Sequence, residues 1–89
     1  MTAGKPRLAR KARLKYDAIE KQHILLYPER GMKLSESAAE ILKRCDGERT
    51  VEAIAEELAA ASGAPADAVL KDVTAFVEEM RKRALVELV

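Results

Sequence analysis

The spacing of apolar residues changes once along this chain, close to residue 35, and this change constrains the fold more than any other feature. Before it, Ala12, Leu14 and Tyr16 alternate with basic residues, which is the period of a half-buried strand. After it, apolar residues recur at intervals of three and four, which is the period of amphipathic helices. Strands followed by helices in this order are typical of an α+β domain.

Three short strands are predicted before the change of period. They are the alternating segment 12–16, the apolar run His23–Tyr27 and the segment Met32–Leu34. Pro28 limits the second strand because it has no backbone N–H, and residues 28–31 have turn chemistry. Short links between successive strands predict a three-stranded antiparallel sheet.

Three helices are predicted after the change of period. Ser35 or Ser37 can cap the first, and Ser37 with the residues up to Glu40 fits a capping box. Thr50 caps the second helix, and Pro65 suits the first turn of the third. The expected apolar stripes are Ala38, Ile41, Leu42 and Cys45, then Ile54, Leu58 and Ala61, then Val69, Val73, Phe76, Val77 and Met80.

This order predicts an α+β fold of the winged helix-turn-helix type, a three-stranded antiparallel sheet followed by three helices. Residues 10–89 are expected to form the domain, and residues 1–9 a flexible N-terminal arm, because they have no convincing period. Residues 85–89 are expected to be a short terminal strand or a packed tail.

Size and composition exclude several functional classes. The chain has 89 residues, enough for one domain, with one Cys, one His and 3% aromatic residues. A disulfide framework, a four-ligand Cys/His zinc site and a surface that stacks bases on several rings are therefore not expected. No signal peptide and no membrane-spanning run is recognised, so we expect a soluble, cytoplasmic protein without a membrane partner.

The charge is balanced overall but uneven along the chain. The net charge is +1, yet residues 1–33 carry nine basic and three acidic residues, and residues 34–89 carry seven basic and twelve acidic ones. Such asymmetry suggests that the basic end seeks an acidic partner. The alternative is that basic strands offset acidic helices within one fold.

No residue pattern points to catalysis. His23 has no fixed carboxylate partner, and Cys45 lies at a helix C-terminus, where the helix dipole disfavours a thiolate. The adjacent acids Glu56-Glu57 and Glu78-Glu79 diverge by about 100° on their helices. We therefore expect neither an enzyme nor a resident metal or cofactor.

Two binding functions remain open. A DNA-binding winged helix is supported by the basic segment Lys5 to Lys15, but the exposed side of the third helix is close to neutral. A peptide-binding domain fits better, because the third strand is a candidate edge that can accept an extended peptide as an added strand. Val69, Asp72 and Phe76 share one margin of the third helix and can wall that edge; the alternative is that its apolar residues are all core.

Four segments in their order and spacing resemble the PqqD family of pyrroloquinoline quinone (PQQ) biosynthesis. They are residues 14–17 (LKYD), 25–30 (LLYPER), 34–42 (LSESAAEIL) and 45–51 (CDGERTV), and the likeness runs from about residue 6 to 86. One departure is Ala84, where the family commonly has Gly.

The resemblance implies a non-catalytic peptide chaperone that binds the precursor peptide PqqA by strand addition. It further implies presentation of that peptide to PqqE, a radical S-adenosylmethionine enzyme. Carried onto this sequence, the peptide-binding residues are Gly31, Met32, Lys33, Leu34, Val69, Asp72, Val73 and Phe76.

Overall fold

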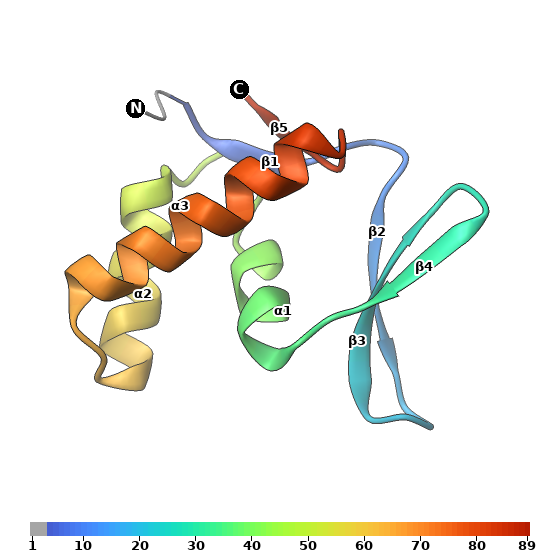
Figure 1. Cartoon of the computed structure of the whole chain (residues 1–89), viewed down its shortest axis with the longest axis horizontal. Helices are drawn as coiled ribbons and strands as arrows, with labels where there is room; N and C mark the ends of the chain where they lie inside the picture. The colour runs from blue at the N-terminus through green and yellow to red at the C-terminus, as the bar shows by residue number, and fades with distance from the viewer. Residues whose placement is uncertain (1–3) are drawn as a thin grey trace.

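A computed structural model describes residues 4–89 of the chain and contains five strands and three helices (Figure 1). The elements follow one another as β1 (Pro6–Leu8), β2 (Arg13–Asp17), β3 (Gln22–Tyr27), β4 (Arg30–Lys33), α1 (Glu36–Lys43), α2 (Val51–Ser62), α3 (Ala66–Lys82) and β5 (Val86–Leu88).

The expected antiparallel sheet is present, with strand order β2-β3-β4. Tyr27 pairs with Arg30, so β3 and β4 are joined by the two-residue loop Pro28–Glu29. Glu29 adopts a left-handed conformation with φ 62°, and a proline followed by such a residue is the combination found in type II turns. The loop is shorter than the four-residue turn expected from the sequence, so β4 begins two residues earlier than the predicted strand.

A second, two-stranded sheet joins the two ends of the fold. Pro6 pairs with Leu88 and Leu8 with Val86, and Arg7 forms an ion pair of 2.8 Å with Glu87. The expectation of a flexible arm over residues 1–9 is therefore wrong for Pro6–Leu8, whereas residues 1–3 lie outside the described part. The segment 85–89, left open between strand and tail, contains strand β5.

The helix ends follow from capping. The Ser35 hydroxyl accepts a hydrogen bond of 3.1 Å from the N–H of Ala38, so Ser35 is the N-cap and the capping box at Ser37 is wrong. Thr50 caps α2 in the same way, accepting from Ala53 at 3.1 Å. Gly63 ends α2 with φ 76°, a left-handed conformation that glycine adopts without strain.

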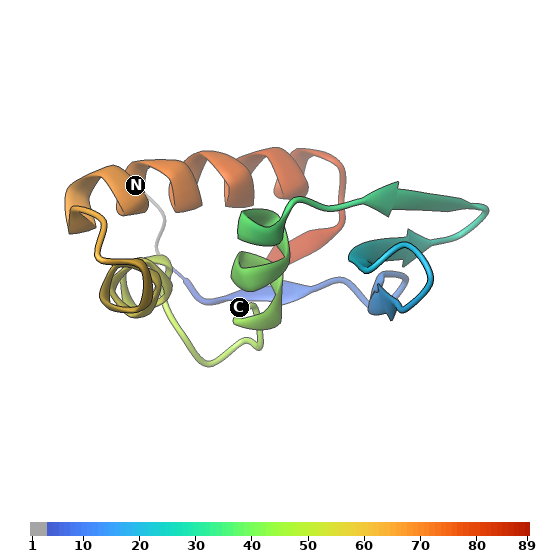
Figure 2. The ribbon, with the colours of Figure 1, turned by 90° about the horizontal axis from the view of Figure 1, so that it is seen from below.

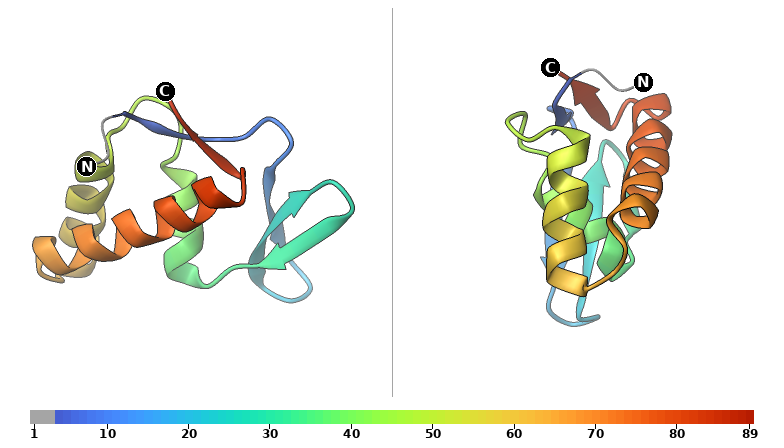
Figure 3. Two further views of the ribbon diagram at one scale, coloured as in Figure 1. Left: turned by 45° about the horizontal axis from the view of Figure 1, so that its top comes forward. Right: turned by 90° about the vertical axis from the view of Figure 1, so that its left-hand side faces the viewer.

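The core lies among the three helices and strand β5, and α1 connects it to the inner face of the three-stranded sheet. Leu25, Leu42, Ile54, Val73 and Val77 are its fully buried centre. Figure 2 shows α3 along one side of the molecule with the three-stranded sheet at one end, and Figure 3 shows α2 and α3 side by side.

The buried face of α2 differs from the predicted one. Val51, Ile54, Ala55 and Ala59 are buried, whereas Leu58 is only half-buried. Ala61 is exposed, because the α2 margin that carries Leu58 borders a pocket instead of the core.

Candidate functional site

Strand β4 is an edge of the three-stranded sheet, because β3 pairs with it on one side only. The N–H of Leu34 donates to the carbonyl oxygen of His23 at 3.0 Å. In an antiparallel ladder the backbone groups of successive residues point alternately toward and away from the partner strand. The N–H and C=O groups of Gly31 and Lys33 therefore point to the open edge.

The side chains of β4 alternate between the core side and the outer face of the sheet. Leu34 is buried and Met32 half-buried on the core side, whereas Gly31 and Lys33 are exposed on the outer face. Lys33 lies 4.0 Å from Glu20, and both side chains are well exposed. Such an exposed pair contributes little to stability. The backbone groups of Lys33 are therefore more important at this edge than its side chain.

A pocket of about 550 Å³ opens between the start of α1, the end of α2 and the first half of α3. Its volume is that of a typical ligand-binding cleft. The lining residues come from all three helices and the α2–α3 connection: Glu36, Ser37, Glu40, Ile41, Leu58, Ala61, Ser62, Ala64, Val69, Asp72 and Val73. Its floor is apolar, and carboxylates lie on its rim.

The residues predicted as one site fall into two neighbouring groups. Gly31–Leu34 belong to the β4 edge, and Val69, Asp72 and Val73 line the pocket. Phe76 is half-buried and packs against the core instead of lining the pocket. The two groups are connected through the chain, because Glu36 on the pocket follows Lys33 on the edge by three residues.

Sequence reasoning missed the contributions of α1 and α2 to the pocket. Glu36 and Ser37 looked like ordinary residues of a helix start, and Leu58 like a core residue. The available signal was that Leu58 and Ala61 extend the stripe of their helix to one side, where the opposing α1 is only eight residues long.

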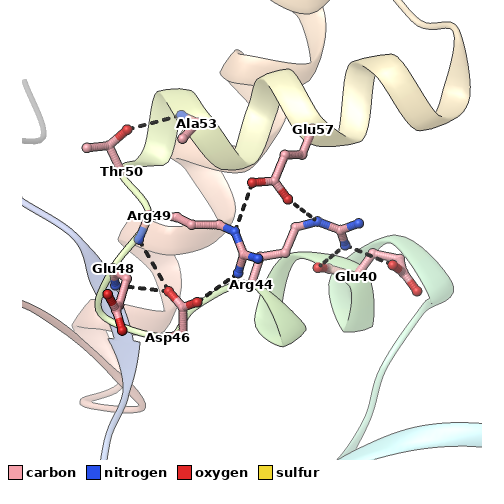
Figure 4. A network of polar contacts seen from close by, with 8 residues as sticks. All are labelled: Glu40, Arg44, Asp46, Glu48, Arg49, Thr50, Ala53 and Glu57. Atoms are coloured by element: carbon pink, nitrogen blue, oxygen red, sulfur yellow. Dashed lines mark hydrogen bonds and ion pairs between the residues drawn. The ribbon is translucent and has the colours of Figure 1, made fainter.

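An ion-pair network on the surface fixes α1 against α2 (Figure 4). Arg44 bridges the two helices: it donates to Glu40 at 2.9 Å and to Glu57 at 3.1 Å. Arg49 donates to the other oxygen of Glu57 at 2.8 Å. Hydrogen bonds donated by Arg44 and then by Lys43 hold the pKa of Glu40 below its ordinary value. The hydrogen bond that Arg44 donates to Glu40 in turn raises the pKa of Arg44.

The same network orders the connection between these helices. The Asp46 carboxylate accepts backbone hydrogen bonds from Glu48 at 2.9 Å and from Arg49 at 3.2 Å, and pairs with the Arg49 guanidinium at 2.8 Å. The pKa of Asp46 is lowered chiefly by the bond from Glu48. The motif at residues 45–51 thus shapes the α1–α2 connection, which positions two walls of the pocket.

The two residues with nucleophilic or acid–base chemistry are held in structural roles. Cys45 is buried, its thiol faces the carbonyl of Ile41 at 3.3 Å, and burial raises its pKa to about 12. His23 packs edge-on against Tyr16, with ring centroids 5.0 Å apart. Residues 4–89 contain no cluster of three metal-ligating side chains. No helix in that range is long and apolar enough to cross a bilayer.

Few basic groups on the exposed side of α3 could contact phosphates: Lys71 and Lys82 form no ion pair within residues 4–89, but the arginines at its C-terminal end do. Arg81 is paired with Glu78 at 3.0 Å, and Arg83 just beyond the helix with Glu79 at 3.1 Å. These basic groups are neutralised within the same turn, so they are poor ligands for phosphates.

Comparisons with known proteins agree on one family. The family model "Coenzyme PQQ synthesis protein D (PqqD)" matches residues 22–86. A PqqA binding protein of Bradyrhizobium diazoefficiens is 41% identical over 78 residues, which are 88% of this chain and 76% of that protein. A PqqA binding protein of Rhizobium meliloti is 39% identical over 83 residues, 93% of this chain and 85% of that protein.

Two solved structures share the fold. The solution structure of the PqqD truncation of Methylobacterium extorquens PqqCD, described as a stand-alone recognition element for ribosomally synthesized and modified peptides, superposes with a TM-score of 0.81. It is 31% identical, over 98% of this chain and 95% of that chain. The crystal structure of PqqD from Xanthomonas campestris, also 31% identical, has a TM-score of 0.64 over 99% of this chain and 98% of that one.

Proposed function

Because this chain belongs to the PqqD family, we propose that it binds the precursor peptide PqqA along the open edge of β4 and presents it to the radical S-adenosylmethionine enzyme PqqE. The family is one of peptide recognition, so the chain itself is not an enzyme. Its pathway is PQQ biosynthesis. We place the protein in the cytoplasm, where a ribosomally made precursor is first available.

The observation that carries the proposal is the alternation of backbone groups along β4. Gly31 and Lys33 offer two N–H and two C=O groups to the open edge, since those of Leu34 are turned toward His23. An extended peptide satisfies such groups by adding a strand. Main-chain hydrogen bonds then give affinity, and the peptide side chains that point toward the core give specificity.

Residues of α3 supply the second wall in this proposal. Val69 and Phe76, both half-buried, offer apolar surface, and Asp72 offers an exposed carboxylate. Val73 is 1% exposed, so it supports this wall from within the core. An added strand has alternating side chains, so every second residue of the peptide faces this wall. Met32 of β4 is half-buried on the core side of the sheet and adds its apolar surface to this wall.

Strand addition also suits delivery to a modifying enzyme. The bound peptide is held mainly by its backbone, so side chains on its outer face and residues beyond the paired segment stay accessible. A relative in Methylorubrum extorquens is a bifunctional coenzyme PQQ synthesis protein C/D, and this chain matches 22% of its length. There the domain is physically joined to another protein of the pathway.

The test is a titration of isotope-labelled protein with PqqA peptide, followed amide by amide. We expect the largest shifts at Gly31, Lys33 and the α3 face. Binding should respond weakly to salt, because main-chain hydrogen bonds carry it. Shifts confined to the Lys5–Lys15 segment that vanish at moderate salt would contradict the proposal and favour an electrostatic contact, the behaviour of the DNA-binding alternative.

Delivery needs its own measurement. Modification of PqqA by purified PqqE should depend on this protein, and a variant that no longer binds PqqA should fail to support it. Equal modification with and without the protein would leave peptide binding intact but contradict presentation.

A further inference from the structure

The pocket combines an apolar floor with an acidic rim. Val73 is 1% exposed and Ile41 6% exposed at its base, and Leu58 and Val69 are half-buried on its walls. Its lining contains no Lys or Arg, but three carboxylates, those of Glu36, Glu40 and Asp72. An anionic ligand is therefore disfavoured by repulsion, whereas a cationic ligand could approach Glu36 and Asp72, which are both exposed to solvent.

Two of these three carboxylates lack a cationic partner within residues 4–89. Glu40 is neutralised by Lys43 and Arg44, each at 2.9 Å. No Lys or Arg nitrogen of the described chain lies within 4.0 Å of the carboxylates of Glu36 or Asp72. Glu36 is in the first turn of α1 and partly offsets the positive end of that helix dipole. Asp72, in the middle of α3, has no such compensation and is the stronger attractor of a cation.

A long cationic side chain matches both properties of the pocket. Lys and Arg have an aliphatic stem that packs on apolar surface and a charged head that stays near water or a carboxylate. The stem would lie against Leu58 and Val69, and the head would lie between Glu36 and Asp72. These two acids come from different helices, α1 and α3, so a cation held between them would contact both walls.

The pocket also lies where a peptide on β4 would continue. Glu36 follows Lys33 by three residues, about 10 Å of extended chain. A peptide that pairs with Gly31 and Lys33 and runs past the C-terminal end of β4 therefore reaches the mouth of the pocket. We propose that the pocket binds a Lys or Arg side chain of the precursor, about two to four residues beyond the segment paired with β4. This inference rests on the proposed function, because it requires a peptide on that edge.

The experiment pairs charge-neutral variants of the protein with charge-neutral variants of the peptide. Asp72→Asn and Glu36→Gln remove charge with little change in shape, and Glu56→Gln on the exposed side of α2 is the matched control. Each Lys and Arg of PqqA is replaced singly by Met, and dissociation constants are measured for every combination. We expect Asp72→Asn to weaken binding about three- to five-fold and Glu36→Gln less, with Glu56→Gln neutral.

The decisive result is coupling. For one peptide position, replacement by Met should weaken binding as much as Asp72→Asn does, and the two changes together should cost no more than either alone. Combining Asp72→Lys in the protein with Glu at that position of the peptide should restore part of the affinity. An Asp72→Asn effect that is absent, that matches the Glu56→Gln control, or that is the same for every peptide variant would overturn the inference.

Amide shifts distinguish this failure from a failure of the proposed function. Shifts at Gly31 and Lys33 that persist without any coupling to Asp72 mean that the peptide binds β4 but not the pocket. Shifts that are absent from Gly31 and Lys33 in the unaltered protein overturn both proposals together.

Discussion

The backbone N–H of Leu34 donates a hydrogen bond of 3.0 Å to the carbonyl oxygen of His23. This single bond sets the phase of β4: the backbone of Leu34 is turned toward β3, and that of its neighbour Lys33 is turned away. The edge proposed to accept the peptide is thus defined by a contact in which neither side chain takes part.

Replacement of Lys33 by proline tests this phase directly. Proline removes the outward N–H and resists pairing with an added strand, while the bonds between β3 and β4 do not use that N–H. We expect Lys33→Pro to weaken PqqA binding about tenfold or more, the sum of a lost hydrogen bond and a steric conflict. Calorimetric titration measures the change.

The matched control for this prediction is Lys33→Ala, which keeps the N–H and should bind nearly as well as the parent. Both variants should show the parent's circular dichroism spectrum. Equal losses in the two variants would assign the effect to the lysine side chain and contradict the edge geometry.

Two truncations in α2 separate the core from the pocket wall. Ile54 is fully buried, so Ile54→Ala should lower the free energy of unfolding by about 2–5 kcal/mol. Leu58 is half-buried beside the pocket, so Leu58→Ala should cost less than half as much. Urea denaturation gives both values, and equal costs would show that Leu58 belongs to the core.

Cys45 should be unreactive in the folded protein. Burial raises the pKa of its thiol to about 12, so at pH 8 almost no thiolate is present to attack a disulfide reagent. Labelling with a chromogenic disulfide should be complete in urea and very slow without it. Rapid labelling of the folded protein would show that the thiol is accessible.

The same shift predicts how stability changes in alkali. The thiol has a higher pKa folded than unfolded, so its contribution is full below the unfolded pKa near 8.5 and is lost as pH rises toward 12. Over that range the parent should lose more stability than Cys45→Ala, which lacks the titrating group. Parallel curves for the two proteins would contradict the assignment.

The lowered pKa of Glu40 predicts a change in stability at acidic pH. Its pKa is lowered by Arg44 and Lys43, so its contribution is present above the unfolded pKa of about 4.3 and is lost as pH falls below it. Glu40→Gln should reduce stability at pH 7 by no more than about 1 kcal/mol, because the pair is partly exposed, and the difference should disappear near pH 2. Thermal unfolding measures both. Glu56→Gln, exposed on α2 beyond its first turn, is the control and should match the parent at both values.

Much of the fold follows from local pattern. The change of period near residue 35 predicts the sheet and the helices, and Thr50 predicts its cap, because these features depend on neighbours within a few residues. The choice of Ser35 over Ser37 as a cap does not follow, since both offer a hydroxyl and the helix start is set by how α1 packs. The pairing of Pro6 with Leu88 has no local signal at all, because its two strands are separated by almost the whole chain.

The candidate site divides in the same way. That β4 would be an edge could be predicted from the order of three short strands, and the structure confirms it. The pocket could not, because it depends on the spacing of three helices and on Leu58 lying at their margin instead of in the core. Asp72 could be predicted as a candidate from its place on the third helix. Glu36, which lines the same pocket, could not, because an acidic residue in the first turn of a helix is common.

The pairing of β1 with β5 determines how the domain responds to pulling. Because the strands are antiparallel and Pro6 lies opposite Leu88, tension applied to the two chain ends acts at the same end of the ladder. The hydrogen bonds between β1 and β5 then break one after another, because the force acts on one bond at a time. An unfolding motor or a strained linker should therefore detach β1 first, at low force, while the β3–β4 hairpin, far from β1 and β5 in Figure 1, is still intact.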